Sequence, residues 1–163
     1  MKVEFRRAEV SSELRSLMTF DKKVFGADAF DRAMWAELEV WWMLVDSVKA
    51  GCAAFEADTA FDRNGEPVRE EGTLYIATTG VLPRLQGRGL GLLLKAWQVA
   101  FARRHGYRRI VTNHRASNAG IIAINKGFGF RRTGRIKGYY SEPDEDAISM
   151  ELVLKDGDLV LKR

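Results

Sequence analysis

The chain has 163 residues, of which 46% are hydrophobic and 29% charged, with a formal net charge of +4; this is typical of one domain with a full hydrophobic core, expected over residues 1–163. No run of about 18 apolar residues is present and the N-terminus is short and charged, which excludes a membrane-spanning helix and a secretory signal. Cys52 is the only cysteine, so no intrachain disulfide is possible, and we expect a cytoplasmic protein with this thiol in its core.

We expect the N-terminal half to form a strand, two helices and a hairpin. Apolar residues at helical spacing follow Ser11, a candidate N-cap, and Asp31 is a candidate cap for a second, shorter helix. Two apolar runs separated by Asp46-Ser47 are typical of a hairpin. The expected elements are a strand at 2–8, helices at 11–25 and 31–40, and strands at 41–45 and 48–57.

The second half is expected to alternate strands and helices. An Asn64-Gly65 turn precedes a strand, and the following helix ends at His105-Gly106. The residues of that helix predicted to face inward are Leu92, Leu93, Ala96, Val99 and Ala100. The expected elements are strands at 73–81, 109–113, 130–133 and 147–154 and helices at 90–105 and 117–126, with the tail 155–163 unassigned.

This order of elements indicates an α/β fold. Hairpins followed by a strand–helix–strand–helix–strand series imply a mixed sheet with helices on both faces. No linker, repeat or low-complexity segment indicates a second domain.

The stretch from Val81 to Leu94 carries three alternating glycines between an apolar strand and an apolar helix. Gly87, Gly89 and Gly91 lack Cβ atoms, so backbone amides there can face outward. The N-terminus of the following helix adds unpaired N–H groups and a partial positive charge. The stretch therefore predicts a seat for an anion, most naturally a phosphate or pyrophosphate.

The positive charge is concentrated in the same part of the chain. Residues 81–137 contain 13 Lys or Arg and no Asp or Glu, whereas the rest contains 13 basic and all 22 acidic residues. This asymmetry suggests one region that binds a polyanion and another that tolerates a cation. The alternative interpretation is a set of solvated helix faces.

Two common phosphate-binding motifs are absent from the chain, namely the P-loop and the dinucleotide fingerprint Gly-x-Gly-x-x-Gly. The chain instead has Gln86-x-x-Gly89-x-Gly91 after Val81-x-Pro83. In its strand-before, helix-after setting, this pattern resembles the signature of the GNAT superfamily of N-acetyltransferases.

A second block strengthens the resemblance. A strand from Arg109 to Asn113 leads to Asn118, which caps a helix that ends before Gly129-Phe130. This arrangement is similar to the second half of the same superfamily. The resemblance is specific from about residue 73 to residue 130, and upstream it rests on the order of elements.

The resemblance implies a GNAT-like fold, with a mixed, mostly antiparallel sheet of about seven strands that splay at the acetyl-CoA site. It implies acetyl-CoA as cosubstrate, no metal, and pantetheine in the gap between the diverging strands. Arg84 and Arg88 are candidates for side-chain contacts with phosphate. The implied cofactor-binding residues are Val81, Leu82, Pro83, Gln86, Gly87, Arg88, Gly89, Leu90, Gly91, Asn118 and Asn125.

One position departs from the family pattern. Many members place a Tyr seven residues after the capping Asn, where it can protonate the departing thiolate; here that position is Asn125. An amide cannot act as a general acid near neutral pH, although it can donate a hydrogen bond to sulfur. Because a thiolate whose thiol has a pKa of about 8.5 is a tolerable leaving group, water is a candidate proton donor.

The expected mechanism is direct attack of a neutral amine on the thioester carbonyl, with the oxyanion stabilised by the Val81 N–H. A base must take a proton from an ammonium acceptor. His114 is a candidate base and Tyr140 a candidate acid or substrate contact. The alternatives are a solvent-facing loop histidine and a packing tyrosine.

The acceptor is expected to be a small-molecule or protein amine, because an acidic N-terminal half could attract a cation. Asp28, Asp31, Glu37 and Glu39 surround the second predicted helix. Two alternatives stay open: a catalytically silent CoA-binding module, and a nucleic-acid-binding protein, for which no recognised motif is present. A homodimer is expected by analogy with the family alone.

Overall fold

The computed structural model describes residues 1–154, and the predicted tail at 155–163 lies outside them. The described chain forms two compact units. Unit 1 comprises residues 1–56 and 77–94, and unit 2 comprises residues 57–76 and the chain from residue 95 onward. The chain passes from one unit to the other within β3, within β4 and within α3.

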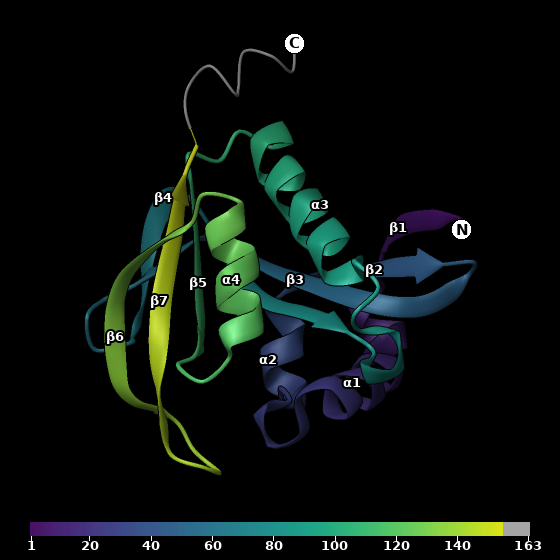
Figure 1. The fold of residues 1–163 in the computed structure, drawn as a ribbon, viewed down its shortest axis with the longest axis horizontal. Helices are drawn as coiled ribbons and strands as arrows, with labels where there is room; N and C mark the ends of the chain where they lie inside the picture. Colours follow the sequence, from purple (N-terminus) through teal and green to yellow (C-terminus); the bar gives the residue numbers. More distant parts are fainter. Residues whose placement is uncertain (155–163) are drawn as a thin grey trace. The chain divides into compact units, whose positions relative to one another are not determined.

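Figure 1 shows the helices and strands of the described chain. The strands are β1 (Val3–Arg7), β2 (Glu39–Val45), β3 (Val48–Phe61), β4 (Pro67–Val81), β5 (Arg109–Arg115), β6 (Arg131–Tyr140) and β7 (Glu145–Val153). The α-helices are α1 (Val10–Phe25), α2 (Arg32–Ala36), α3 (Leu90–Arg104) and α4 (Ala119–Gly127), and the 3-10 helices are η1 (Gly26–Asp28) and η2 (Pro83–Leu85).

The seven strands follow the order β1-β2-β3-β4-β5-β7-β6 in one sheet. β4 and β5 pair in parallel, and the pairs β1–β2, β2–β3, β5–β7 and β6–β7 are antiparallel. This confirms the predicted mixed, mostly antiparallel α/β sheet. The parallel pairing joins Thr73–Tyr75 to Arg109–Val111, and beyond it β4 runs on to Val81 and β5 to Arg115.

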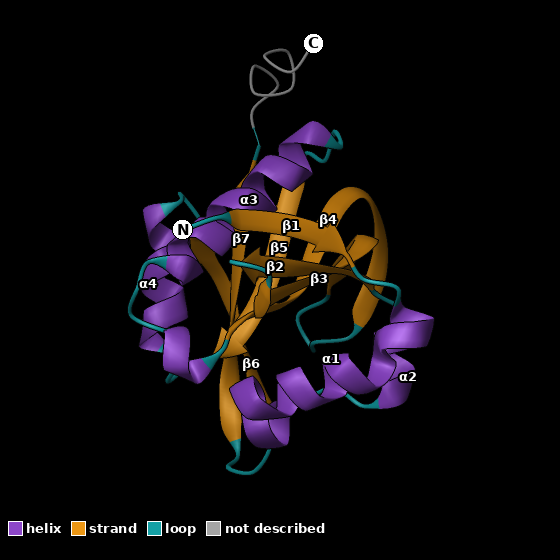
Figure 2. Cartoon of the chain, turned by 90° about the vertical axis from the view of Figure 1, so that its right-hand side faces the viewer, coloured by secondary structure: helices purple, strands orange, loops and turns teal. Residues whose placement is uncertain are grey.

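The core of unit 1 forms where α1 and α2 pack against β2 and β3, as Figure 2 shows. Leu17 and Trp42 are fully buried, and Phe20 contacts the Trp42 ring edge-on at 5.4 Å between centroids. Cys52 is 2% exposed, which confirms its predicted place in the core. Burial of these large side chains is the main source of stability in unit 1.

Two helix boundaries in unit 1 differ from prediction. α1 begins one residue before Ser11, and its N-cap is Glu9, whose N–H donates to the Glu13 carboxylate at 2.7 Å. α2 ends at Ala36 rather than at residue 40, because residues 39–45 form β2, which pairs with strands on both sides. The predicted cap is confirmed: Asp31 Oδ1 accepts the Met34 N–H at 2.9 Å.

The β3–β4 hairpin is longer than predicted. β3 extends to Phe61 and β4 begins at Pro67, so the strand residues continue up to the turn itself. Asp62 fixes this turn, because its Oδ1 accepts the N–H groups of Asn64 and Glu66 at 2.8 and 3.0 Å. The backbone hydrogen bonds of the longer hairpin satisfy polar groups that would bond to water if these residues formed a loop.

In unit 2, β5 and β7 supply the central strands and α4 lies against them (Figure 1). The prediction for α3 was right for Val99, which is 3% exposed, and wrong for Leu92 and Leu93, which are 53% and 38% exposed. The buried residues of α3 are Leu90, Leu94, Lys95, Gln98, Val99, Phe101 and Ala102. The apolar pattern misled because two polar residues occupy the inward positions.

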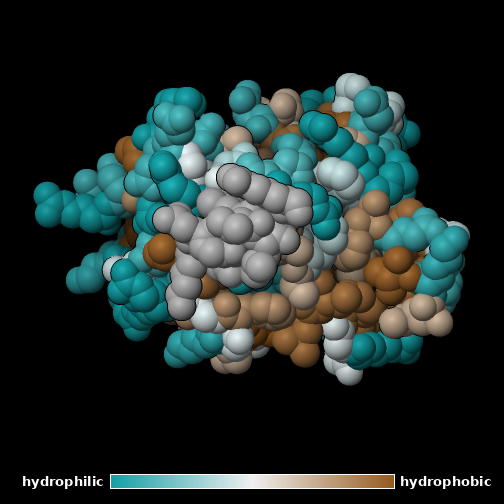
Figure 3. Space-filling model, turned by 90° about the horizontal axis from the view of Figure 1, so that it is seen from above, coloured by the Kyte–Doolittle hydropathy of each residue, from teal (hydrophilic) through white to brown (hydrophobic). Residues whose placement is uncertain are grey.

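None of the helices within residues 1–154 is long and apolar enough to cross a membrane. Figure 3 shows hydrophilic atoms over most of the visible face, with hydrophobic atoms gathered along one side of it. The exposed large hydrophobic side chains include Leu92 and Val153, at 53% and 58%.

Candidate functional site

The glycine turn of unit 1 connects η2 to α3. Gly87 and Gly89 have φ angles of +79° and +80°, a left-handed conformation that is costly for any residue with a Cβ. A Cβ at either position would meet no heavy atom within 4 Å, so the space over the turn is open. The first bond of α3 runs from the Leu93 N–H to the Gly89 carbonyl at 3.1 Å.

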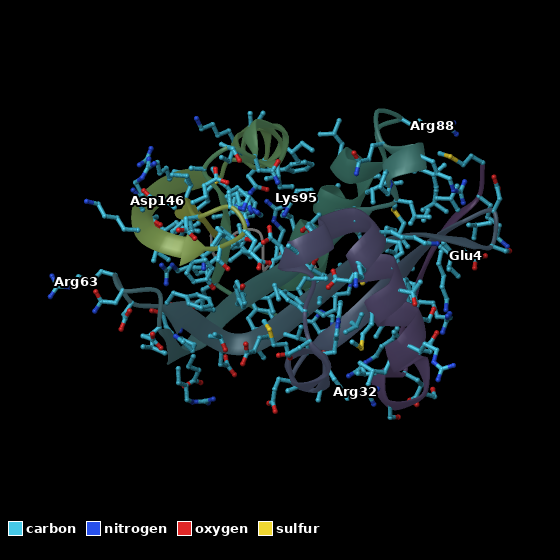
Figure 4. The ribbon with its side chains drawn as sticks, turned by 90° about the horizontal axis from the view of Figure 1, so that it is seen from below. Glu4, Arg32, Arg63, Arg88, Lys95 and Asp146 are labelled. Atoms are coloured by element: carbon cyan, nitrogen blue, oxygen red, sulfur yellow. The ribbon has the colours of Figure 1, made fainter. Side chains whose placement is uncertain are left out.

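The N–H groups of Gly87, Arg88 and Gly89 donate no hydrogen bond within the described residues. Those of the first turn of α3 have no carbonyl four residues earlier in the helix. Open space, free donors and the positive end of a helix dipole together make a seat for an anion. Arg88 extends outward from this turn, as Figure 4 shows, and is exposed.

The residues before the glycines hold the turn in place. The Gln86 side chain donates through Nε2 to the Val81 carbonyl at 3.0 Å, and its own N–H donates to the Pro83 carbonyl at 3.3 Å. The Leu82 N–H donates to the Ala50 carbonyl of β3 at 2.9 Å. Gln86 therefore fixes the turn through its side chain, and its main-chain amide is not available to a ligand.

Four of the 13 basic residues in 81–137 form ion pairs in unit 2. Arg109 and Arg131 both pair with Glu151, at 2.6 Å each. Arg115 pairs with Glu145 at 3.1 Å, and Arg135 pairs with Asp146 at 2.6 Å. The carboxylates come from outside the acid-free stretch, so ion pairs that form on folding account for part of the asymmetry along the sequence.

A buried polar group in unit 2 brings two predicted site residues together. Asn125, which is 0% exposed, donates from Nδ2 to His114 Nε2 at 2.9 Å. Thr112 Oγ1 lies 3.3 Å from the same ring nitrogen and donates to the Ile76 carbonyl at 3.1 Å. With the amide in this orientation, Nε2 accepts and the imidazole carries its proton on Nδ1.

His114 lies in β5 and its side chain is largely buried, so the prediction of a loop position was wrong. Burial, and after it the positive charge of Lys95, lower its pKa to about 3. At this pKa the His114 imidazole is neutral near pH 7. The neighbouring Asn125 Oδ1 is buried without a hydrogen-bond partner in the described chain.

Sequence reasoning missed Lys95, a buried ionisable residue whose charge acts on His114 in unit 2. It is 0% exposed, its Nζ lies 5.5 Å from the centre of the Phe130 ring, and burial lowers its pKa to about 7. Figure 4 shows it among tightly clustered side chains. Helical periodicity gives no signal for it, because a lysine in an apolar helix is normally placed on the solvent face.

Asn118 and Tyr140 have structural contacts in unit 2. Asn118 caps α4, as predicted, because its Oδ1 accepts the Ile121 N–H at 3.3 Å. The Tyr140 hydroxyl donates to the Asn113 carbonyl at 3.3 Å, and the Arg115 guanidinium lies 4.8 Å from its ring centre. Within the described residues, no group of three or more His, Cys, Asp or Glu side chains is placed to hold a metal ion.

The turn and the sheet define an α/β protein with a glycine turn of free main-chain N–H groups at a helix N-terminus. The model of the acetyltransferase (GNAT) family matches residues 10–130, and the chain belongs to this family. It is thus an acyltransferase of the N-acetyltransferase class, as the resemblance implied. No curated protein matches the chain.

Solved structures share the fold at low sequence identity. The ribosomal-protein-S18-alanine N-acetyltransferase from Escherichia coli is 19% identical, with a TM-score of 0.78 over 94% of this chain and 95% of that one. Arabidopsis thaliana Naa50, solved with a bisubstrate analogue, is 20% identical, with a TM-score of 0.76 over 94% and 100%. A Bacillus subtilis acetyltransferase in complex with CoA is 17% identical, with a TM-score of 0.74 over 94% and 100%.

Proposed function

We propose that the protein transfers an acetyl group from acetyl-CoA to a primary amine. The observation that carries the proposal is the glycine turn, where free main-chain N–H groups and positive-φ glycines open onto the N-terminus of α3. The turn suits a pyrophosphate, because no Cβ fills it and no carboxylate lies on it. The CoA-bound structure of the Bacillus subtilis relative supports the same cosubstrate.

In this proposal the donor site is built from unit 1. Gly87, Arg88 and Gly89, with the first turn of α3, hold the pyrophosphate, and the main chain of β4 up to Val81 lies along the pantetheine arm. Acetyl-CoA supplies an activated thioester whose C–S bond breaks as the amine nitrogen bonds to the carbonyl carbon. The Val81 N–H donates to the carbonyl oxygen as negative charge develops there.

In this proposal the predicted base, His114, does not take part in proton transfer. A pKa of about 3 makes His114 a poor acceptor of a proton from an ammonium group. We therefore assign His114 and Asn125 to the buried structure of unit 2. Solvent removes the proton from the amine in the proposed reaction, and water protonates the thiolate.

The acceptor we favour is the amine of a polypeptide. The Escherichia coli relative is named for an alanine of a ribosomal protein, and the Arabidopsis thaliana relative was solved with CoA-Ac-MVNAL, a peptide-bearing analogue. The identities of 19% and 20% establish only a shared fold. They support a polypeptide acceptor for this chain without identifying it.

Calorimetry with acetyl-CoA tests the donor site, using Gly89→Asp and Gly89→Ala as a matched pair. Both variants carry a Cβ at a φ of +80°, but only Asp places a negative charge in the seat. We expect Gly89→Asp to lose binding and Gly89→Ala to retain most of it. Equal affinity of the two variants would show that no anion sits at this turn, and thiol release over an amine panel then separates an enzyme from a silent binder.

A further inference from the structure

Two adjoining grooves lie along one face of α1 in unit 1. The first, of about 570 Å³, is lined by Arg15, Met18, Thr19, Lys22, Gly26, Ala27, Ala29, Phe30 and Arg32. The second, of about 530 Å³, is lined by Ser12, Arg15, Ser16, Thr19, Phe20, Lys23, Trp42, Lys49 and Leu82. Arg15 and Thr19 line both, so the two grooves adjoin at these residues, and together they are here called the α1 trough.

The charge of the α1 trough has one sign. Five of its lining residues are Lys or Arg, and none is Asp or Glu. Arg15, Lys22, Lys23 and Arg32 are exposed and form no ion pair with any residue between 1 and 154. Arg32, which lines the first groove, is labelled in Figure 4. Like charges gathered without counter-charges favour an anionic ligand.

Four carboxylates of the N-terminal half already accept hydrogen bonds. Glu13 accepts hydrogen bonds from Arg6 and Lys49, and burial raises the pKa of Asp21, which accepts the Phe30 N–H at 2.6 Å. Asp31 caps α2, and Glu39 accepts the Trp41 indole N–H at 2.8 Å. The acidic composition of this half therefore does not give an acidic groove.

We propose that the α1 trough binds acidic side chains of an extended polypeptide, and that this polypeptide is the amine acceptor. The second step rests on the proposed function. The trough reaches Leu82, the residue after Val81, so an occupant of the trough lies beside the end of β4 within the same unit. The acceptor class is thus a protein whose amine is close in sequence to Asp or Glu residues.

The spacing of the cations fits a peptide. A rise of about 1.5 Å per residue puts Arg15 and Lys22 about 10 Å apart along α1, and three residues of an extended chain cover about the same length. A single-stranded nucleic acid is typically held by exposed aromatic rings on which its bases stack. Phe20 and Trp42 are buried instead, and Phe30 packs edge-on against Trp35 at 5.4 Å.

The binding experiment uses a fluorescent eight-residue peptide rich in Asp and Glu, and an Asn/Gln counterpart, with anisotropy measured in the absence of CoA. The test variant is Arg15→Gln/Lys22→Gln/Arg32→Gln. The matched control is Arg63→Gln/Arg69→Gln/Arg104→Gln, which removes the same charge from exposed positions of unit 2; Figure 4 shows Arg63 at the edge of the molecule. Unchanged thermal unfolding of both variants excludes a folding defect.

We expect the acidic peptide to bind and its neutral counterpart not to, with an affinity loss of about tenfold in the test variant and less than twofold in the control. In the acetylation assay kcat/KM for the acidic peptide should fall by a similar factor, while KM for acetyl-CoA stays constant. Failure of acetyl-CoA to bind would overturn the proposed reaction but leave the anisotropy result readable.

Four results would overturn the inference. The first is that the neutral peptide binds as well as the acidic one. The second is that the control variant loses as much affinity as the test variant. The third is that a single-stranded oligonucleotide of equal charge binds the trough more tightly, which would indicate phosphodiester recognition. The fourth is that CoA competes with the peptide, which would assign the trough to the phosphates of CoA.

Discussion

Replacement of Lys95 by Met should make unit 2 more stable, and the gain should depend on pH. Lys95 is 0% exposed, and Met is an unbranched apolar side chain of similar length that can fill the same space. Burial lowers the Lys95 pKa from 10.5 to about 7. At about 1.4 kcal/mol per pKa unit, a charged Lys95 costs on the order of 5 kcal/mol in the folded state.

The direction in which stability changes with pH follows from proton binding. Between pH 7 and 10 the unfolded chain keeps the Lys95 proton while the folded chain has lost it, so wild-type stability rises with pH. The stability difference between Lys95→Met and wild type should therefore be largest below about pH 7. It should shrink by about 1.4 kcal/mol per pH unit up to about pH 10.

Urea unfolding followed by tryptophan fluorescence at a series of pH values measures this difference. Lys126→Met, at an exposed position in the last turn of α4, is the control and should show no such slope. A difference that stays constant between pH 6 and pH 10 would show that the Lys95 ammonium is solvated, and would refute the reasoning.

Three further predictions concern single residues. Asp21→Asn keeps an acceptor for the Phe30 N–H, and because burial raises the Asp21 pKa to about 6, the wild type should lose about 3 kcal/mol relative to this variant as pH rises from 4 to 7; parallel pH profiles in chemical unfolding would contradict this. Gly89→Ala should cost about 1–2 kcal/mol of stability because of its φ of +80°, whereas Gly120→Ala in α4 should cost nothing, and equal melting temperatures would show that the turn adapts. Burial raises the pKa of the Cys52 thiol, so iodoacetamide should label it only in denaturant; full labelling of the native protein at pH 8 would place the thiol at the surface.

The features of the site that sequence predicted are those fixed by local chemistry. The glycine turn, the Asn118 cap and the Asp31 cap each depend on residues within about four positions of one another. Their conformations follow from the glycine φ preference and from side-chain capping. The order of strands and helices was likewise predictable, because strand and helix periodicities are properties of short segments.

The features that sequence missed depend on distant residues. Arg109 and Glu151 are 42 positions apart, so the acid-free stretch could not reveal that part of its charge is neutralised. Lys95 is buried because of what packs around α3, and composition alone assigned the exposed Leu92 and Leu93 to the interior.

The ion pairs on the β5–β7–β6 side of the sheet also limit how this sequence can diverge. Glu151 on β7 stands directly opposite Arg131 on β6, and it also binds Arg109 on β5. Loss of Glu151 in one step would leave two guanidinium groups beside one buried position. The Arg131 side chain is 73% exposed, whereas Arg109 is 31% exposed and also pairs with Glu70. Descendants that replace Glu151 with an apolar residue are therefore expected to change Arg109 more often than Arg131, whose charge water can solvate.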